Sequence, residues 1–335
     1  MPVRDDLRAL EGYHSPQVDV RVRLNTNEAP GEPPAAWRDA FAAELSRVAW
    51  HRYPDRAATE LRAEIAAMHG VATEQVFVAN GSNEVLQTVL LTFAGPGRTV
   101  GDALTRSPKV GKIMFTGSTE VGKRIIQASA DNITRLTLEL GGNDAGIVLP
   151  DVDAAEIAEN LFWGAFINTG QTCAALKRLY VHDSVYDEVL EKLVEFAKNV
   201  PMGVGLDEQN VLGPLQNKGQ FDVVDRLVEA AKASGARVVL GGNPDRDAPG
   251  YFYPTTIVAD IDPHNALVVE EQFGPALPVI RYTDVEEAIR LANELEFGLG
   301  ASVWSKDRAE ATRIAARLES GTVWINSHGG LHPMI

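Results

Sequence analysis

From residue 101 onward, short apolar runs alternate with longer stretches whose apolar residues recur at helical spacing. The apolar runs predict strands at residues 112–115, 136–140, 145–149, 237–240, 255–258, 277–280, 301–304 and 322–325. The amphipathic stretches predict helices at residues 118–128, 154–168, 185–199, 222–234, 285–295 and 309–318. This alternation is typical of an α/β fold, in which helices cover a mainly parallel sheet.

The first 100 residues have a different pattern, in which predicted helices prevail. Residues 37–48 and 59–68 carry apolar residues at helical spacing, and the second helix is expected to stop at Gly70. Residues 75–79 form a short β-rich run, which predicts a strand. The Asn-Gly-Ser-Asn sequence at residues 80–83 predicts a turn that opens another helix and suits an anion.

The chain has 335 residues, of which 45% are hydrophobic, and its formal net charge is −15. Such an acidic protein would be repelled by nucleic acid and by anionic membranes, so we expect neither as a partner. No apolar run reaches the roughly 18 residues of a membrane span. The charged start of the chain lacks the apolar stretch of a secretory signal. These features predict a soluble, cytoplasmic protein.

The chain has one cysteine, Cys173, which excludes an internal disulfide and a metal site built from several cysteines. The histidines show neither HxxxH nor HExxH spacing, so we expect no bound metal. Cys173 follows a small-residue loop, and an exposed thiol with a lowered pKa is a good nucleophile. A buried, inert cysteine is the alternative that this position alone leaves open.

Other candidate residues lie where strands end. Glu139 precedes two glycines at the end of a predicted strand, the edge at which ligands bind in α/β sheets; a solvated glutamate is the alternative. Residues 115–122 form a strand–glycine–helix turn whose free N–H groups suit a phosphate, although an ordinary tight turn fits as well. Residues 270–275 pair two acids with an aromatic residue, and a charged loop with one core Phe explains them equally.

Residues 101–335 contain, in this order, the six motifs FTGSTEVG, LELGGND, NTGQTC, EEQFGP, FGLGASVW and GTVWINSHG. In these motifs and their order, this part of the chain resembles the NAD(P)-dependent aldehyde dehydrogenase superfamily. The resemblance implies a catalytic lobe with a parallel sheet and covering helices, and an incomplete Rossmann-like cofactor lobe. It also implies oxidation of a small-molecule aldehyde to a carboxylic acid, with NAD or NADP as the cofactor.

The resemblance assigns chemical roles to two residues. Cys173 would be the nucleophile that attacks the aldehyde, forming a thiohemiacetal and then a thioester. Its backbone N–H would be one donor to the oxyanion. Glu139 would be the general base that activates the thiol or the hydrolytic water.

The same resemblance implies a set of binding residues. Gly117 and Ser118 would meet the cofactor pyrophosphate at a helix N-terminus. Glu271 would hydrogen-bond to the nicotinamide ribose, and Phe273 would lie near the nicotinamide ring. Asn326 would belong to the loop that lines the substrate funnel.

The first 100 residues contain LNTNE at residues 24–28, RYPD at residues 52–55 and ANGSNE at residues 79–84. In these motifs the segment resembles the N-terminal third of histidinol-phosphate aminotransferase, a pyridoxal phosphate enzyme. The segment lacks that family's Schiff-base lysine, so we expect no pyridoxal phosphate and no transamination. We therefore predict a chimera of three parts. These are an aminotransferase-like segment (1–100), a partial nucleotide-binding lobe (101–142) and a catalytic lobe (143–335).

Each part lacks segments that its family has. The dehydrogenase part is expected to lack the first strands of the cofactor lobe and the C-terminal strand that pairs subunits. Without this pairing strand, the sequence does not decide whether the protein forms a homo-oligomer. An alternative prediction is therefore a catalytically impaired chimera that retains, at most, ester hydrolysis dependent on Cys173.

Overall fold

The computed structural model describes residues 33–48, 55, 57–79 and 100–330. The chain divides into two compact units, residues 1–90 and residues 91–335, and each is described by itself. Among the described residues, no helix is both long and apolar enough to cross a membrane.

The first unit contains the helices α1 (Ala35–Leu45) and α2 (Thr59–His69), followed by the 3₁₀ turn η2 (Thr73–Gln75). Both predicted helices are confirmed, and α2 ends at Gly70, which has the left-handed backbone conformation that favours glycine. In α1 no residue is buried, and the predicted apolar side is exposed, with Trp37 54% accessible.

The predicted strand at residues 75–79 is wrong. Gln75 closes a tight turn, because its side-chain oxygen accepts the N–H of Ala72 at 2.9 Å. The Arg62 guanidinium donates hydrogen bonds to the carbonyls of Thr73 and Val76, each at 2.7 Å. These local bonds replace strand pairing. The turn and helix predicted from residue 80 lie outside the described residues.

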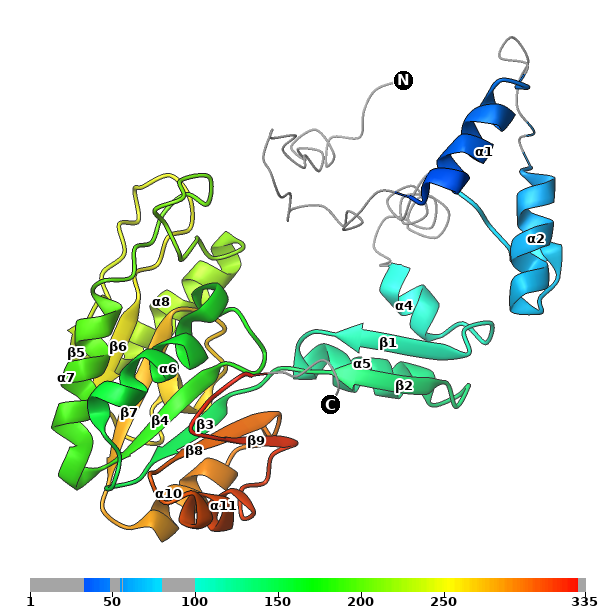
Figure 1. Ribbon diagram of the computed structural model, residues 1–335. Helices are drawn as coiled ribbons and strands as arrows, with labels where there is room; N and C mark the ends of the chain where they lie inside the picture. The colour runs from blue at the N-terminus through cyan, green and yellow to red at the C-terminus, as the bar shows by residue number, and fades with distance from the viewer. Residues whose placement is uncertain (1–32, 49–54, 56, 80–99, 331–335) are drawn as a thin grey trace. The chain divides into compact units, whose positions relative to one another are not determined.

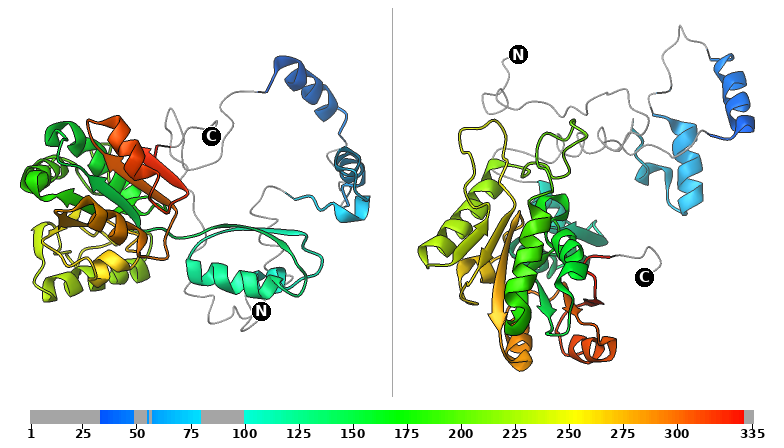
Figure 2. Two further views of the ribbon diagram at one scale, coloured as in Figure 1. Left: turned by 90° about the horizontal axis from the view of Figure 1, so that it is seen from below. Right: turned by 60° about the vertical axis from the view of Figure 1, so that its left-hand side comes forward.

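The second unit begins with α4 (Val100–Thr105) and a small parallel sheet of β1 (Lys112–Thr116) and β2 (Arg135–Glu139). Helix α5 (Thr119–Ser129) connects β1 to β2 in the sequence and lies along the small sheet, as Figure 2 shows. Because α5 is amphipathic, its Ile125 and Ala128 are buried.

A larger sheet follows, with the strand order β5-β6-β7-β4-β3-β8-β9 (Figure 1). All neighbours are parallel except β5 and β6. Its strands are β3 (Asp144–Val148), β4 (Leu176–His182), β5 (Arg237–Leu240), β6 (Thr256–Ala259), β7 (Ala276–Tyr282), β8 (Gly300–Trp304) and β9 (Thr322–Ile325). Its helical segments are α6 (Ala154–Phe166), η3 (Ile167–Gly170), η4 (Asp183–Val185), α7 (Tyr186–Ala197), α8 (Lys218–Ala233), α9 (Ala266–Val269), α10 (Val285–Asn293) and α11 (Arg308–Ala315).

Two hydrophobic cores lie on opposite faces of the large sheet. Helices α6 and α7 pack on one face against Leu179 and Val181 of β4. Helices α8, α10 and α11 pack on the other face, to which Tyr180 of β4 contributes. This alternation along β4 is the two-residue period of a strand buried on both sides.

The predicted α/β fold with a mainly parallel sheet is confirmed. All eight predicted strands and all six predicted helices from residue 101 onward are present, with ends that differ by a few residues. Helix α8 begins earlier than expected because the side chain of Asn217 caps it by accepting the N–H of Gln220 at 2.9 Å. The prediction missed α4, α9 and, most importantly, the central strand β4.

Candidate active site

A cavity of about 740 Å³ lies between the turn after β1, the glycines after β2 and the loop that contains Cys173. Its lining includes five residues predicted from the sequence: Gly117, Ser118, Cys173, Glu271 and Phe273. Gln171, Thr172, Gln216 and Gln220 also line it. Gln171 and Thr172 belong to the motif that contains Cys173, whereas nothing in the sequence marks Gln216 or Gln220.

The loop before Cys173 has an unusual backbone. Asn168 and Thr169 both have positive φ angles, 51° and 58°, which a β-branched residue such as threonine rarely adopts. The Thr169 hydroxyl donates to the Gly213 carbonyl at 3.0 Å and accepts the Gly213 N–H at 3.1 Å. The surrounding structure therefore holds a strained loop in place, as often occurs at functional sites. Cys173 itself is half-buried.

The glycines after β2 allow two groups to approach closely. A Cβ atom on Gly142 would overlap the carbonyl oxygen of Cys173, and one on Gly141 would overlap the carboxylate of Glu271. The N–H of Gly142 donates to Glu271 Oε1 at 3.1 Å. Glycine is thus required here because the Cys173 loop and the turn that carries Glu271 both contact this backbone.

The turn from Glu271 to Gly274 forms another wall of the cavity. The buried Gln272 donates to the carbonyl of Leu267, and its own carbonyl accepts from Gln220 Nε2 at 2.7 Å. Burial raises the pKa of Glu271 above its usual value, although the Gly142 N–H opposes this shift. The turn presents a carboxyl group and the half-buried ring of Phe273 to the same space.

At the third wall, Ser118 caps α5, and its hydroxyl accepts the N–H of Val121 at 3.4 Å. The N–H of Gly117 donates to the backbone carbonyl of Glu139 at 3.0 Å. Because Ser118 already binds the N–H of Val121, the first-turn amides that remain free to meet an anion are those of Thr119 and Glu120.

Two predicted site residues lie outside the cavity lining. Glu139 ends β2, and its side chain is exposed. Asn326 follows β9, where its side-chain amide accepts the N–H of Ser305 and donates to the Ser305 carbonyl, each at 2.8 Å. Gly329, three residues after Asn326, lies beside the residue that follows Cys173, because a Cβ atom on Gly329 would be 3.9 Å from the carbonyl oxygen of Ala174.

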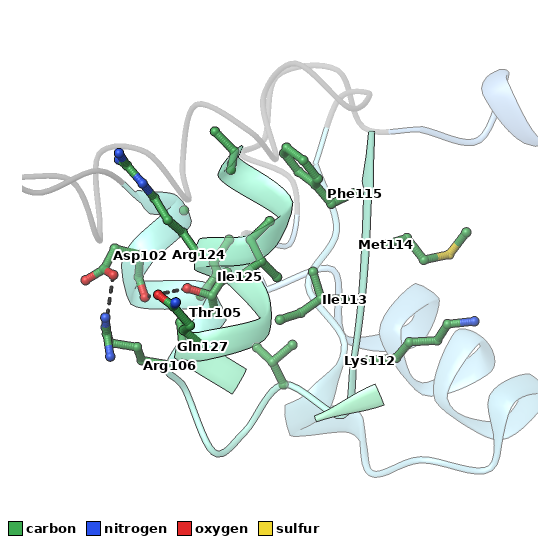
Figure 3. A pocket seen from close by; sticks show the side chains of 15 residues that line it. Asp102, Thr105, Arg106, Lys112, Ile113, Met114, Phe115, Arg124, Ile125 and Gln127 are labelled. Atoms are coloured by element: carbon green, nitrogen blue, oxygen red, sulfur yellow. Dashed lines mark hydrogen bonds and ion pairs between the residues drawn. The ribbon is translucent and has the colours of Figure 1, made fainter. Parts of the chain in front are cut away.

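A second cavity, of about 690 Å³, lies between α4, β1 and α5. Figure 3 shows its largely apolar wall, which includes Ile113, Phe115 and Ile125, with Arg106 and Arg124 among its polar residues. Within the parts of the chain that the structure describes, no group of three or more His, Cys, Asp and Glu side chains is arranged to hold a metal ion.

Comparison with known proteins agrees with this geometry. Residues 65–334 match the aldehyde dehydrogenase family, and the chain belongs to it. The chain is 41% identical over 239 residues to mouse retinaldehyde dehydrogenase 3, covering 71% of the chain and 46% of the relative. It is 40% identical over 245 residues to phenylacetaldehyde dehydrogenase of Pseudomonas fluorescens, covering 73% of the chain and 49% of that protein.

Solved structures show the same likeness. A betaine aldehyde dehydrogenase from Staphylococcus aureus, in complex with NAD⁺, superposes with a TM-score of 0.67 at 34% identity. The superposition covers 70% of this chain and 49% of that one. The chain thus spans about half the length of the curated relatives that it matches.

Proposed function

We propose that the protein oxidises an aldehyde to a carboxylic acid with NAD or NADP, using Cys173 as the nucleophile. The observation that carries this proposal is the single cavity that Cys173 shares with Ser118, the N-cap residue of α5, and with Phe273. A nucleophile, an anion-binding helix end and a flat aromatic surface are what a thiol-dependent, dinucleotide-dependent oxidation requires.

The cavity residues fit a dinucleotide. The unpaired first-turn amides of α5 would hold the diphosphate, with Gly117 allowing close approach and Ser118 capping the helix. The carboxyl of Glu271 would accept a hydrogen bond from a ribose hydroxyl, and the ring of Phe273 would lie against the nicotinamide ring. When bound, the oxidised nicotinamide supplies a hydride acceptor.

The Cys173 sulfur would add to the aldehyde carbonyl, and the Cys173 N–H would stabilise the resulting oxyanion. Loss of hydride leaves a thioester, which water cleaves to the acid and the free thiol. We assign proton transfer in these steps to Glu139, which immediately precedes the lining residue Leu140. Because Glu139 does not line the cavity in this structure, the role requires its side chain to move towards the cavity.

We propose the substrate only as a class. The names of the relatives include retinaldehyde, phenylacetaldehyde and betaine aldehyde, which differ in size and charge. We assign Asn326 to the loop beside the substrate, and the proximity of Gly329, further along this loop, to Ala174 supports the assignment.

A second candidate activity is ester hydrolysis by Cys173. It needs no nucleotide: the thiol displaces an alcohol from the ester, and water cleaves the thioester. The half-buried position of Cys173 in an open cavity favours it.

We limit the aminotransferase-like proposal to residues 1–64. The family match begins at residue 65 and so includes residues 79–84, one of the three motifs behind that resemblance. The motifs at residues 24–28 and 52–55 precede the match. Pyridoxal phosphate is no part of this proposal.

The test is calorimetric titration with NAD and NADP, followed by assays with aldehydes and with a p-nitrophenyl ester. We expect saturable binding of one nucleotide and aldehyde-dependent formation of the reduced nucleotide. Cys173→Ser should abolish turnover while the variant still binds nucleotide and melts cooperatively. Ester cleavage without nucleotide binding would favour the second candidate, and turnover that survives Cys173→Ser would contradict both.

A further inference from the structure

Lys177 is a buried lysine that the proposed mechanism does not use. It lies on the central strand β4 and is only 2% exposed. Its Nζ donates to the carbonyl of Gly274 at 2.7 Å and to the carbonyl of Ala165 at 3.4 Å. Burial lowers its pKa to about 7, although the negative charges of Glu271 and Asp144 oppose the shift.

Three segments meet at this amino group. Ala165 belongs to the last turn of α6, and Gly274 ends the turn that carries Glu271 and Phe273. Gly170, in the loop before Cys173, contacts the same place, because a Cβ atom there would lie 2.6 Å from Lys177 Nζ and would overlap the carbonyl of Gly274. Lys177 therefore bonds directly to the cofactor-side turn at the point where this turn contacts the nucleophile loop.

Stability alone does not explain a lysine at this position. Burying an ammonium group is costly, and an apolar side chain of similar volume is often as stable. A methionine would fill the space but could not donate to the two carbonyls. The lysine supplies what packing cannot, namely directional bonds that fix one segment relative to another.

We propose that Lys177 is a positioning residue that fixes the Glu271–Gly274 turn relative to the loop of Cys173. The consequence for hydride transfer rests on the function proposed above, whereas the link between the two segments does not. Because a misplacement of about 1 Å can reduce a reaction rate about 100-fold, this separation would govern turnover more than binding.

The strength of the link should depend on pH. A charged amine donates more strongly than a neutral one, so the bond to Gly274 weakens as Lys177 loses its proton. The charged groups facing Lys177 are Glu271 on the turn and Asp144 on β3. His328 in turn faces Asp144, with its Nε2 at 3.5 Å from Oδ2.

The experiment measures alkylation of the full chain by iodoacetamide from pH 6 to pH 8.5. Because Cys173 is the single cysteine, all labelling reports on the nucleophile loop. Lys177→Met removes the donor, Lys177→Arg keeps a permanent cation, and Lys218→Met is the control at an exposed lysine paired with Asp222. Thermal melting checks that each variant is folded.

We expect Lys177→Met to raise the alkylation rate about tenfold at pH 6, since the loss of a charged hydrogen bond frees the turn. The ratio of this rate to that of the unmodified protein should fall as pH passes 7, whereas Lys218→Met should follow the unmodified protein. Taking the ratio at each pH cancels the ionisation of Cys173 where the two proteins have the same thiol pKa, which the alkylation profile of each protein gives directly.

A folded Lys177→Met protein that is alkylated like the unmodified protein at every pH would overturn the proposal. If Lys177→Met does not fold, Lys177→Arg decides. If Lys177→Arg is alkylated slowly and its rate shows no extra rise as the pH passes 7, the proposal is supported. If Lys177→Arg shows the same rise near pH 7 as the unmodified protein, the proposal is overturned. Absence of nucleotide binding by the unmodified protein would count against the proposed function only, because the alkylation assay contains no nucleotide.

Discussion

The two sheets of the second unit differ in burial although their strands are similar in length. Every residue of β3 is buried, whereas in β1 exposed residues alternate with half-buried ones. Met114 of β1 is 74% exposed, while Lys177 and Arg178 of β4 are each 2% exposed. Burial therefore follows the number of neighbouring strands and covering helices rather than the hydrophobicity of the strand.

The largest loss of stability is expected at Arg178, a buried residue of the large sheet. Its guanidinium donates to the carbonyls of Asn143, Leu291 and Ala292 at 2.7–3.1 Å. Arg178→Met would leave three buried acceptors without this donor, so we expect unfolding free energy to fall by about 3–6 kcal/mol. Urea titration measures this loss.

The matched change is Lys123→Met on α5. Lys123 pairs with Glu296 at 3.0 Å, and both side chains are largely exposed. The expected loss is below about 1 kcal/mol, because water screens such pairs. Equal losses at Arg178 and Lys123 would contradict the contrast between buried and exposed cations.

Apolar truncation tests the same contrast without charge. Leu179 of β4 is fully buried among α6 and α7, so Leu179→Ala should cost about 2–5 kcal/mol through lost burial and a cavity. Met114→Ala on β1 should change the unfolding free energy by no more than about 0.5 kcal/mol. A large effect at Met114 in the same urea titration would mean that β1 is covered in solution.

The buried Lys177 predicts a pH dependence of stability. Between about pH 7 and pH 10.5 the unfolded chain keeps the Lys177 proton, whereas the folded chain has lost it. Unfolding then takes up a proton, so stability rises with pH, by at most about 1.4 kcal/mol per unit from this group. Lys177→Met should flatten the slope of unfolding free energy between pH 7.5 and pH 9.5, and an unchanged slope would show that Lys177 stays charged.

Hydrophobic periodicity was sufficient to predict most strands of the large sheet. Residues 277–280 of β7, for example, form an unbroken apolar run and all four are buried, so local sequence and tertiary burial agree. Strand β4 was missed because Lys177 and Arg178 interrupt its apolar run. Their burial depends on carbonyls that are distant in sequence, such as those of Gly274 and Ala292.

The candidate site was also only partly predictable, because some of its residues come together through contacts between distant segments. Cys173 and Phe273 lie in compact local motifs, whereas Gln216 and Gln220 enter the cavity only through the packing of α8 and the loop before it. The close approach of Glu271 to Gly142 joins residues 129 positions apart, which no local pattern contains. Sequence thus identified the loops, and tertiary structure determined how they meet.

The smallest expected difference between the two regions is at the helix N-caps. Asp153 caps α6 by accepting two N–H groups, at 3.0 and 3.4 Å, whereas Ser118 caps α5 through one bond of 3.4 Å. Asp153→Ala should therefore cost about 1 kcal/mol, and Ser118→Ala about 0.5 kcal/mol, in the urea titration. If the proposed diphosphate site is correct, Ser118→Ala should weaken nucleotide binding in calorimetry, whereas Asp153→Ala should not. Equal nucleotide affinity in both variants would remove Ser118 from the cofactor site and leave it only the role of a helix cap.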